Sequence, residues 1–144
     1  HGCDSLANVA TLSGLTNLLV LNLSHCKSLT NLDGLSGLTN LTGLNLSGCK
    51  SLTDVDVLRG LKNLTELNLS GCDSLSTIDG LCGLKNLKSL NLDRCGSLTR
   101  TCLKVLSSLK SLTSLHLPSG LDDDWTSEEK ELLQSLRDSI SITH

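Results

Sequence analysis

The sequence contains no phenylalanine, tyrosine or methionine, and it has a single tryptophan and a single proline. A globular core of mixed shapes uses aromatic and methionine side chains to fill irregular gaps, so this composition argues against such a core. Leucine supplies most of the hydrophobic residues, which make up 38% of the 144 positions. A core of one residue type suits a structure with identical layers, because one packing arrangement then serves every layer. The composition therefore predicts a single domain made of repeats.

The sequence also lacks signals for several locations and partners. No apolar run is long enough to span a membrane, and no charged segment followed by an apolar one forms a signal peptide. The formal net charge is −3, whereas a nucleic-acid surface needs a clear excess of basic residues. We therefore expect no membrane and no nucleic acid among the partners. The chain begins with His1 instead of methionine, which indicates a fragment, a processed product or an engineered chain.

One short segment recurs along the chain with a constant 23-residue period. In each copy, two leucines separated by one residue would share one face of a strand, because successive side chains alternate. The other leucines recur mainly at every third position, which favours short 3-10 or helical turns. An incomplete copy precedes the others, so the chain enters partway round a coil. The complete copies are Leu21–Cys26, Leu44–Cys49, Leu67–Cys72 and Leu90–Cys95.

The pattern L-x-x-L-x-L-x-x-C-x-x-L at residues 41–52 resembles the leucine-rich repeat family. The continuation through residues 54–64 resembles the short internalin-type repeats, and the cysteine is similar to that of the cysteine-containing subclass. The resemblance covers about residues 2–117. It implies an α/β fold: a right-handed solenoid with a parallel β-sheet on its concave face and 3-10 or short helical turns on its convex face. For function it implies only a protein-binding surface.

The last repeat and the segment after it depart from this period. The step from Leu90 to Leu115 is two positions longer than the step from Leu67 to Leu90. The additional positions fall in the segment 100–109, whose apolar spacing predicts one or two turns of α-helix. The single proline then ends the periodic pattern. We therefore divide the chain into a solenoid of about five coils, residues 1–117, with the first coil partial, and a C-terminal cap, residues 118–144.

The cap has the pattern of an amphipathic helix. Thr126 and Glu129 have the spacing of a capping box, and apolar residues at helical spacing follow. We predict a helix at about 127–139, with Trp125 packed on the end of the solenoid. Such a cap covers the apolar end and the open edge of the sheet. No equivalent precedes Gly2, so we expect weak self-association through the uncapped N-terminal edge.

Five of the seven cysteines stand at one position of successive coils. We interpret them as structural thiols that turn inward and hydrogen-bond the backbone where it bends out of the strand. Disulfides between neighbours fit badly because parallel Cβ vectors do not suit the disulfide dihedral, and one cysteine per coil without clustered histidines offers no zinc site. The sequence thus predicts no metal and no cofactor. This thiol ladder comprises Cys3, Cys26, Cys49, Cys72 and Cys95.

The two remaining cysteines, Cys82 and Cys102, stand off this ladder. A bridge between them stays an open alternative. So many unpaired thiols favour a reducing compartment, although buried thiols can persist elsewhere. The sequence does not otherwise indicate a location.

No set of catalytic residues is brought together by the repeat. A catalytic site needs a nucleophile, a base and a group that orients the base. His25 and Cys26 are adjacent, but neighbours in a strand point to opposite faces. The sequence has no phosphate-binding loop, no metal motif and no paired carboxylates in a segment that would form a pocket. We therefore predict that the protein is not an enzyme, and a thiol or metal enzyme is the least favoured alternative.

The concave columns of the predicted sheet are the candidate binding surface. They are uniform, rich in asparagine and serine and free of aromatic residues, whereas binding hot spots favour tryptophan, tyrosine and arginine. Our first hypothesis is a non-catalytic module that binds a protein partner through this face. The alternative is a scaffold or an idealised repeat array without a dedicated ligand. The candidate partner-binding residues are Asn22, Asn45, Glu66, Asn68, Lys88, Asn91, Asp93, Arg94 and His116.

Overall fold

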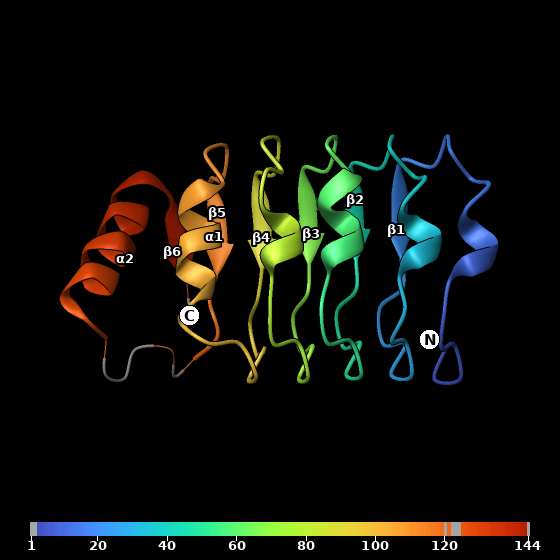
Figure 1. Cartoon of the computed structure of the whole chain (residues 1–144), viewed down its shortest axis with the longest axis horizontal. Helices are drawn as coiled ribbons and strands as arrows, with labels where there is room; N and C mark the ends of the chain where they lie inside the picture. Colours follow the sequence, from blue (N-terminus) through green and yellow to red (C-terminus); the bar gives the residue numbers. More distant parts are fainter. Residues whose placement is uncertain (1–2, 120, 122–124, 144) are drawn as a thin grey trace.

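The computed structural model describes residues 3–119, 121 and 125–143. Within these residues, six strands of three residues each form one parallel sheet in chain order. Neighbouring strands are in register, so Leu21, Leu44 and Leu67 lie directly opposite one another. Figure 1 shows the strands side by side along the long axis of the molecule. Their bounds are β1 (Val20–Asn22), β2 (Gly43–Asn45), β3 (Glu66–Asn68), β4 (Ser89–Asn91), β5 (Ser114–His116) and β6 (Ser141–Thr143).

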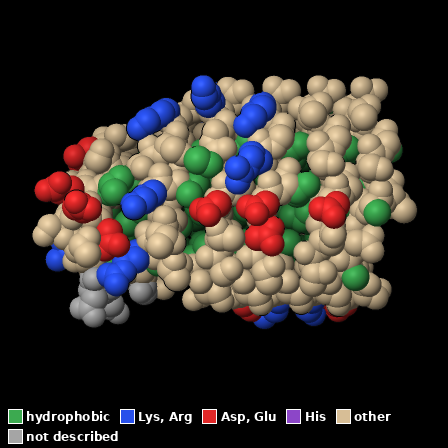
Figure 2. Space-filling view, in the orientation of Figure 1, with side chains coloured by type: hydrophobic (Ala, Val, Ile, Leu, Met, Phe, Trp, Pro, Cys, Tyr) green, Lys and Arg blue, Asp and Glu red, His purple; other side chains and the backbone are tan. Residues whose placement is uncertain are grey.

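Short helical turns form a second layer over the sheet (Figure 1). This layer confirms the predicted α/β solenoid, and α1 lies in the lengthened last repeat as expected. In Figure 2, which shows the face with the helical turns, acidic side chains form a row across the middle, in keeping with the aspartates that begin η2, η3 and η4. The turns in the described solenoid are η1 (Ala10–Leu12), η2 (Asp33–Leu35), η3 (Asp56–Gly60), η4 (Asp79–Leu81) and α1 (Cys102–Ser108).

Two glycines allow the helical layers of neighbouring coils to lie close together. A Cβ atom added to Gly34 would lie 1.9 Å from the carbonyl oxygen of Val9. One added to Gly80 would lie 2.1 Å from the carbonyl oxygen of Val55. Gly60 has far more room, since the nearest atom to its added Cβ is 4.0 Å away. The close backbone approach between coils therefore requires glycine at Gly34 and Gly80.

The core is a stack of leucines that continues from coil to coil. Leu29, Leu46 and Leu69 are 0% exposed, and no polar or charged side chain is buried among the described residues. Full burial of a leucine side chain contributes about 1.5–3 kcal/mol. Because each coil repeats the same apolar positions, the stack needs neither aromatic residues nor methionine to fill gaps.

The C-terminal cap contains the helix α2, Ser127–Ser139, at the predicted position. It begins with a capping box: the Glu129 amide donates to Thr126 Oγ1 over 3.3 Å, and the Thr126 amide donates to Glu129 Oε2 over 2.8 Å. The latter bond is the main reason why the pKa of the Glu129 carboxyl is lowered. Arg100 Nη1 lies 3.6 Å from the same carboxylate, and Trp125 is buried. No helix among the described residues has the length and apolar character that crossing a membrane requires.

The last strand, β6, is not predicted from the sequence. It follows α2 and pairs in parallel with β5, so Ile142 lies opposite Leu115 and Thr143 opposite His116. The step from Leu115 to Ile142 is longer than the repeat period because α2 takes the place of a short turn. The segment Ser141–Thr143 has the polar–apolar–polar alternation of β5, which is the signal that could have revealed it. The cap therefore extends the sheet by one strand.

Candidate partner-binding site

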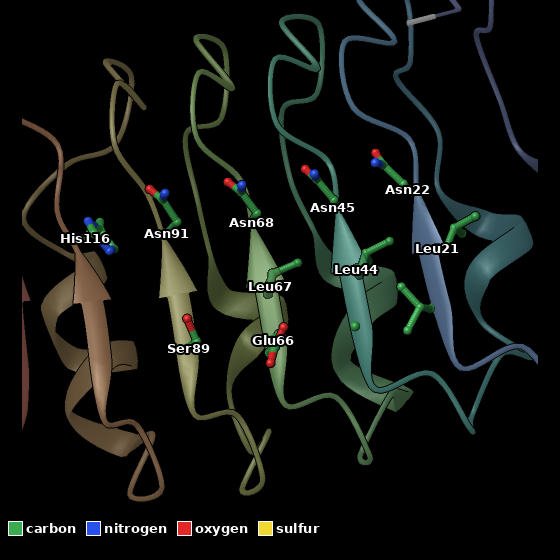
Figure 3. A pocket seen from close by; sticks show the side chains of 12 residues that line it. Leu21, Asn22, Leu44, Asn45, Glu66, Leu67, Asn68, Ser89, Asn91 and His116 are labelled. Carbon is green, nitrogen blue, oxygen red and sulfur yellow. The ribbon is translucent and has the colours of Figure 1, made fainter. Parts of the chain in front are cut away.

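The sheet face is hollowed into a groove of about 430 Å³ that crosses strands β1 to β5. Because side chains alternate along a strand, the first and third residues of each strand point to this side, and the middle leucines of β1 to β3 also border the groove. Figure 3 shows the groove from close by. The residues that line this concave groove are Val20, Leu21, Asn22, Gly43, Leu44, Asn45, Glu66, Leu67, Asn68, Ser89, Asn91 and His116.

The structure does not bring the nine candidate residues together on one surface. Lys88 precedes β4, is exposed and does not line the concave groove. Asp93 and Arg94 follow β4 and lie in a separate hollow of about 370 Å³ with Lys50 and Asp73. The physical reason is that each strand has only three residues, so positions before and after it leave the face. The six that do line the groove are Asn22, Asn45, Glu66, Asn68, Asn91 and His116.

Four asparagines of the groove end their strands in the same way. The side-chain oxygen of each accepts a hydrogen bond from the backbone N–H two residues further on, over 2.9 to 3.0 Å. Such an Asx turn bends the chain out of the strand. The asparagines are Asn22, Asn45, Asn68 and Asn91, and the donors are Ser24, Ser47, Ser70 and Asp93.

The same geometry leaves the amide nitrogens of these asparagines on the groove side. Within the described residues, none of the four Nδ2 groups has a hydrogen-bond acceptor. Neighbouring strands lie about 4.8 Å apart, so the Nδ2 groups recur at about this spacing, and Figure 3 shows the four amides in line. We call these four side chains the asparagine row. They present a set of aligned, unused donors.

In a second column of asparagines, the amide nitrogen, instead of the oxygen, forms the hydrogen bond to the backbone. Asn63 Nδ2 donates to the Thr39 carbonyl over 2.9 Å, and its equivalents in neighbouring coils make the same bond. We expect Asn63→Asp to lower the free energy of unfolding by about 1 kcal/mol, because a carboxylate cannot donate this bond. Asn68→Asp keeps an acceptor for its Asx turn, so it should change the free energy of unfolding by less than about 0.5 kcal/mol. Urea unfolding of both variants tests this, and equal losses would contradict it.

The groove changes in character along its length. At the β1 end Val20 is 66% exposed, and its side chain lies 3.5 Å from the position that a Cβ atom on Gly43 would take. In the middle stands Glu66, the one lining residue with a formal charge when histidine is counted as neutral. At the β5 end, His116 takes the place of asparagine, and its Nδ1 lies 2.5 Å from Thr143 Oγ1. The order is therefore apolar, then acidic, then neutral polar.

The separate hollow contains unusual backbone positions. Arg94 and His25 have φ angles of 56° and 60°, in the left-handed region. Gly48 and Gly71, at the equivalent positions of other coils, have φ angles of 71° and 69°. A residue with a Cβ atom is strained there by roughly 1–2 kcal/mol. Glycine at the equivalent positions is the signal that could have predicted this conformation, which sequence reasoning did not identify.

The thiol ladder forms hydrogen bonds from coil to coil. Sγ of Cys49, Cys72 and Cys95 donates to a backbone carbonyl of the preceding coil over 3.3, 3.2 and 3.1 Å. Burial raises the pKa of Cys49 to about 11 and those of Cys72 and Cys95 to about 12. The thiolate is the nucleophilic and metal-binding form of cysteine, so these thiols are unreactive at neutral pH. The acceptors are Leu23, Leu46 and Leu69.

In the described part of the chain, Cys3, at the N-terminal end of the thiol ladder, and the two cysteines outside the ladder do not form these hydrogen bonds between coils. Cys3 is exposed, unlike Cys26 in the next coil, because no coil among the described residues covers its outer side. Cys82 is exposed and Cys102 is buried, and both are free thiols. Within residues 3–119, 121 and 125–143, no group of three or more histidines, cysteines or acidic residues could hold a metal ion.

Comparisons with known proteins agree with this architecture. The family model described as leucine-rich repeats (2 copies) matches residues 16–60 and 39–82. Internalin InlF of Listeria monocytogenes is similar, with a TM-score of 0.65 and 30% identity over 79% of this chain and 35% of that chain. Internalin C2 of the same bacterium has a TM-score of 0.70 and 25% identity, over 96% and 57% of the two chains. A leucine-rich repeat protein of Leptospira interrogans has a TM-score of 0.62 and 27% identity, over 92% and 38%.

The parallel sheet, the repeat and these matches identify the chain as a leucine-rich repeat protein. Its short repeats are similar to those of the internalins. Among curated protein sequences no match was found. The chain spans 35% and 57% of the lengths of the two internalin structures, so it corresponds to part of proteins of that kind.

Proposed function

We propose that this leucine-rich repeat protein binds a protein partner through the concave groove and performs no catalysis. Leucine-rich repeat proteins are generally protein-interaction modules. The observation that carries the proposal is the asparagine row, because its Nδ2 donors are held in place by the Asx turns and have no acceptor within the described residues. Donors fixed in advance lose little freedom when a partner binds.

The scaffold hypothesis accounts less well for this row. The turn at the end of each strand needs only an acceptor, and serine or aspartate would also supply one. Asparagine adds two N–H donors that the turn does not use. A scaffold without a ligand has no need for these donors at four successive coils. The uniformity of the row is what we expect if it binds one repetitive or elongated surface.

Blocking the groove tests the proposal. Gly43 lies in the groove floor, with only the Val20 side chain near an added Cβ, at 3.5 Å, so Gly43→Arg should fill the groove without disturbing the core. Peptides selected from an unconstrained display library against the wild-type protein should bind Gly43→Arg at least tenfold more weakly. Lys85→Ala, on an exposed residue outside the groove, is the matched control. Lys85→Ala should leave binding unchanged, and binding that survives Gly43→Arg would rule out the groove.

A second proposal concerns the β1 end of the solenoid. Among the described residues, the large hydrophobic side chains that stand exposed are Leu15, Leu19 and Val20, at 49%, 58% and 66%. Val20 begins β1, Leu19 directly precedes it and Leu15 lies in the segment that leads to it; the outer side of β1 has no partner strand in the described part of the chain. Unpaired strand edges favour pairing with another strand. We propose weak self-association of two copies through this edge.

Light scattering over a range of concentrations tests the self-association. We expect the apparent mass of the wild type to rise with concentration, and that of the double variant Leu19→Lys, Val20→Lys to stay at the monomer value. Both residues are exposed, so the variant should fold. A constant monomer mass for the wild type at the highest concentration would exclude this proposal.

A further inference from the structure

The chemistry of the concave groove limits what can fill it. Each side-chain oxygen of the asparagine row already accepts a hydrogen bond from its own backbone, whereas both N–H groups of each amide are unused within the described residues, so the row favours acceptor atoms. Glu66 is the single formal charge on the lining, and an uncompensated carboxylate covered by a partner is costly. The occupant should therefore supply a row of acceptor oxygens and one positive charge near Glu66 on β3.

The spacing of the row favours one kind of backbone. The four donors span three strand steps of about 4.8 Å, or about 14 Å. Side chains on one face of an α-helix recur once per turn, about 5.4 Å, so three turns cover about 16 Å. An extended strand repeats every second residue, about 6.6 Å, and three such repeats cover about 20 Å. Flexible side chains can absorb the first mismatch of about 2 Å but not the second of about 6 Å.

The width of the groove agrees with this choice. Its floor is as wide as the strands are long, and three residues of strand extend about 10 Å. An α-helix with side chains has a diameter of about 10–12 Å. A helix lying across the strands, parallel to the asparagine row, would thus cover the floor. At the β1 end, the exposed Val20 and the space above Gly43 would receive an apolar side chain one to two turns away from the residue over Glu66.

We propose that the concave groove binds an α-helix of the partner protein, with a lysine or arginine over Glu66 and amide or hydroxyl oxygens over the asparagine row. This inference rests on the proposed function and specifies the partner's chemistry. One ion pair at Glu66 would fix the register of the helix, because the asparagine row offers the same donor at every coil that it crosses. The neutral row then contributes hydrogen bonds on either side of that pair.

Selection from two display libraries tests the proposal. In the first, 16-residue peptides are held helical by two crosslinks and randomised at four positions of one face, i, i+4, i+7 and i+11. In the second, unconstrained peptides carry a central proline, which disfavours a helix. Both libraries are selected on the wild type and on Glu66→Lys. We expect the helical library to give lysine or arginine at one position on the wild type, and aspartate or glutamate at that position on Glu66→Lys.

Affinity measurements on the selected helix complete the test. Its dissociation constant should rise at least tenfold on Glu66→Lys and about fivefold to tenfold on the double variant Asn68→Ser, Asn91→Ser. Serine keeps an acceptor for the turn but removes the amide donor without adding a charge. Glu128→Lys, an exposed carboxylate of α2 outside the groove, is the matched control and should leave the affinity unchanged. Thermal melts check that each variant is folded.

The outcomes separate this inference from the proposed function. Helical pools without a basic preference, or identical pools on the wild type and Glu66→Lys, would overturn the inference. If only the proline library yields peptides and Gly43→Arg abolishes their binding, the helix is wrong while groove binding stands. If neither library yields a peptide whose binding Gly43→Arg weakens, the inference and the proposed function both fail.

Discussion

Raising the pH from about 9 to about 10 is expected to lower the free energy of unfolding by about 4 kcal/mol, summed over four buried thiols. Burial raises the pKa of Cys49 and Cys102 from an ordinary value of 9.0 to about 11, and those of Cys72 and Cys95 to about 12. The folded protein then keeps protons that the unfolded chain releases. Stability is therefore complete below the ordinary pKa and falls as the pH rises towards the folded values. Each thiol contributes about 1 kcal/mol of this loss, because the slope reaches its limit of about 1.4 kcal/mol per pH unit only well above the ordinary pKa.

Urea unfolding at steps of pH measures this loss, and two cysteine variants give it a control. Cys72→Ala removes one of the four thiols, so its stability should fall with pH about a quarter less steeply, although it starts lower. Cys82→Ala removes an exposed thiol and should follow the wild-type slope. The slopes of the three proteins are compared under identical conditions, so the difference isolates the buried thiol. Identical slopes for the wild type and Cys72→Ala would contradict the role of burial.

Gly80→Ala is expected to lower the free energy of unfolding by about 3 kcal/mol, at the upper end of the usual cost of overpacking. Its Cβ would lie 2.1 Å from the carbonyl oxygen and 2.5 Å from the carbonyl carbon of Val55. Both are backbone atoms of the preceding coil, so no side chain can rotate away. Relief requires the two coils to move apart, which also separates the leucines stacked between them.

Gly60→Ala is the matched control, because its nearest neighbour is 4.0 Å from the added Cβ. It should change stability by less than about 1 kcal/mol, and the reduced freedom of the unfolded chain makes a small gain possible. Midpoints and slopes of urea unfolding for both variants test the difference. If Gly80→Ala and Gly60→Ala were equally stable, the close approach of the coils at Gly80 would be wrong.

The fold could be predicted from the sequence to the extent that several independent signals agreed. Two leucines separated by one residue identify each strand, because alternating side chains place both leucines on the same face. Leu44 and Leu67 lie opposite each other in neighbouring strands, as this pattern predicts. The helix α2 was predicted because the Thr126–Glu129 capping box and an apolar stripe coincide. The strand Ser141–Thr143 was missed because so short a segment carries one alternation, and because α2 places it later than the repeat period would.

The residues of the groove could be predicted less completely than the fold, because aligning the repeats does not show at which residue each strand ends. Lys88 and Arg94 were expected on the concave face because they depart from the uniform repeat, yet they flank a short strand and leave its surface. Asn45 and Asn68 were placed correctly. Their division into a bonded oxygen and an unused nitrogen follows from the path of the chain after the strand, and residue types alone do not reveal that path.

Because neighbouring coils are in register, the length of the groove is set by the number of repeats. Each added repeat unit extends the sheet by one strand and the asparagine row by one donor. Duplication or loss of a unit would therefore change the reach of the surface in steps of about 4.8 Å without altering its chemistry. If the groove binds an elongated partner as proposed, its affinity for that partner could evolve by repeat number, while Glu66 on β3 would keep the register of the partner fixed.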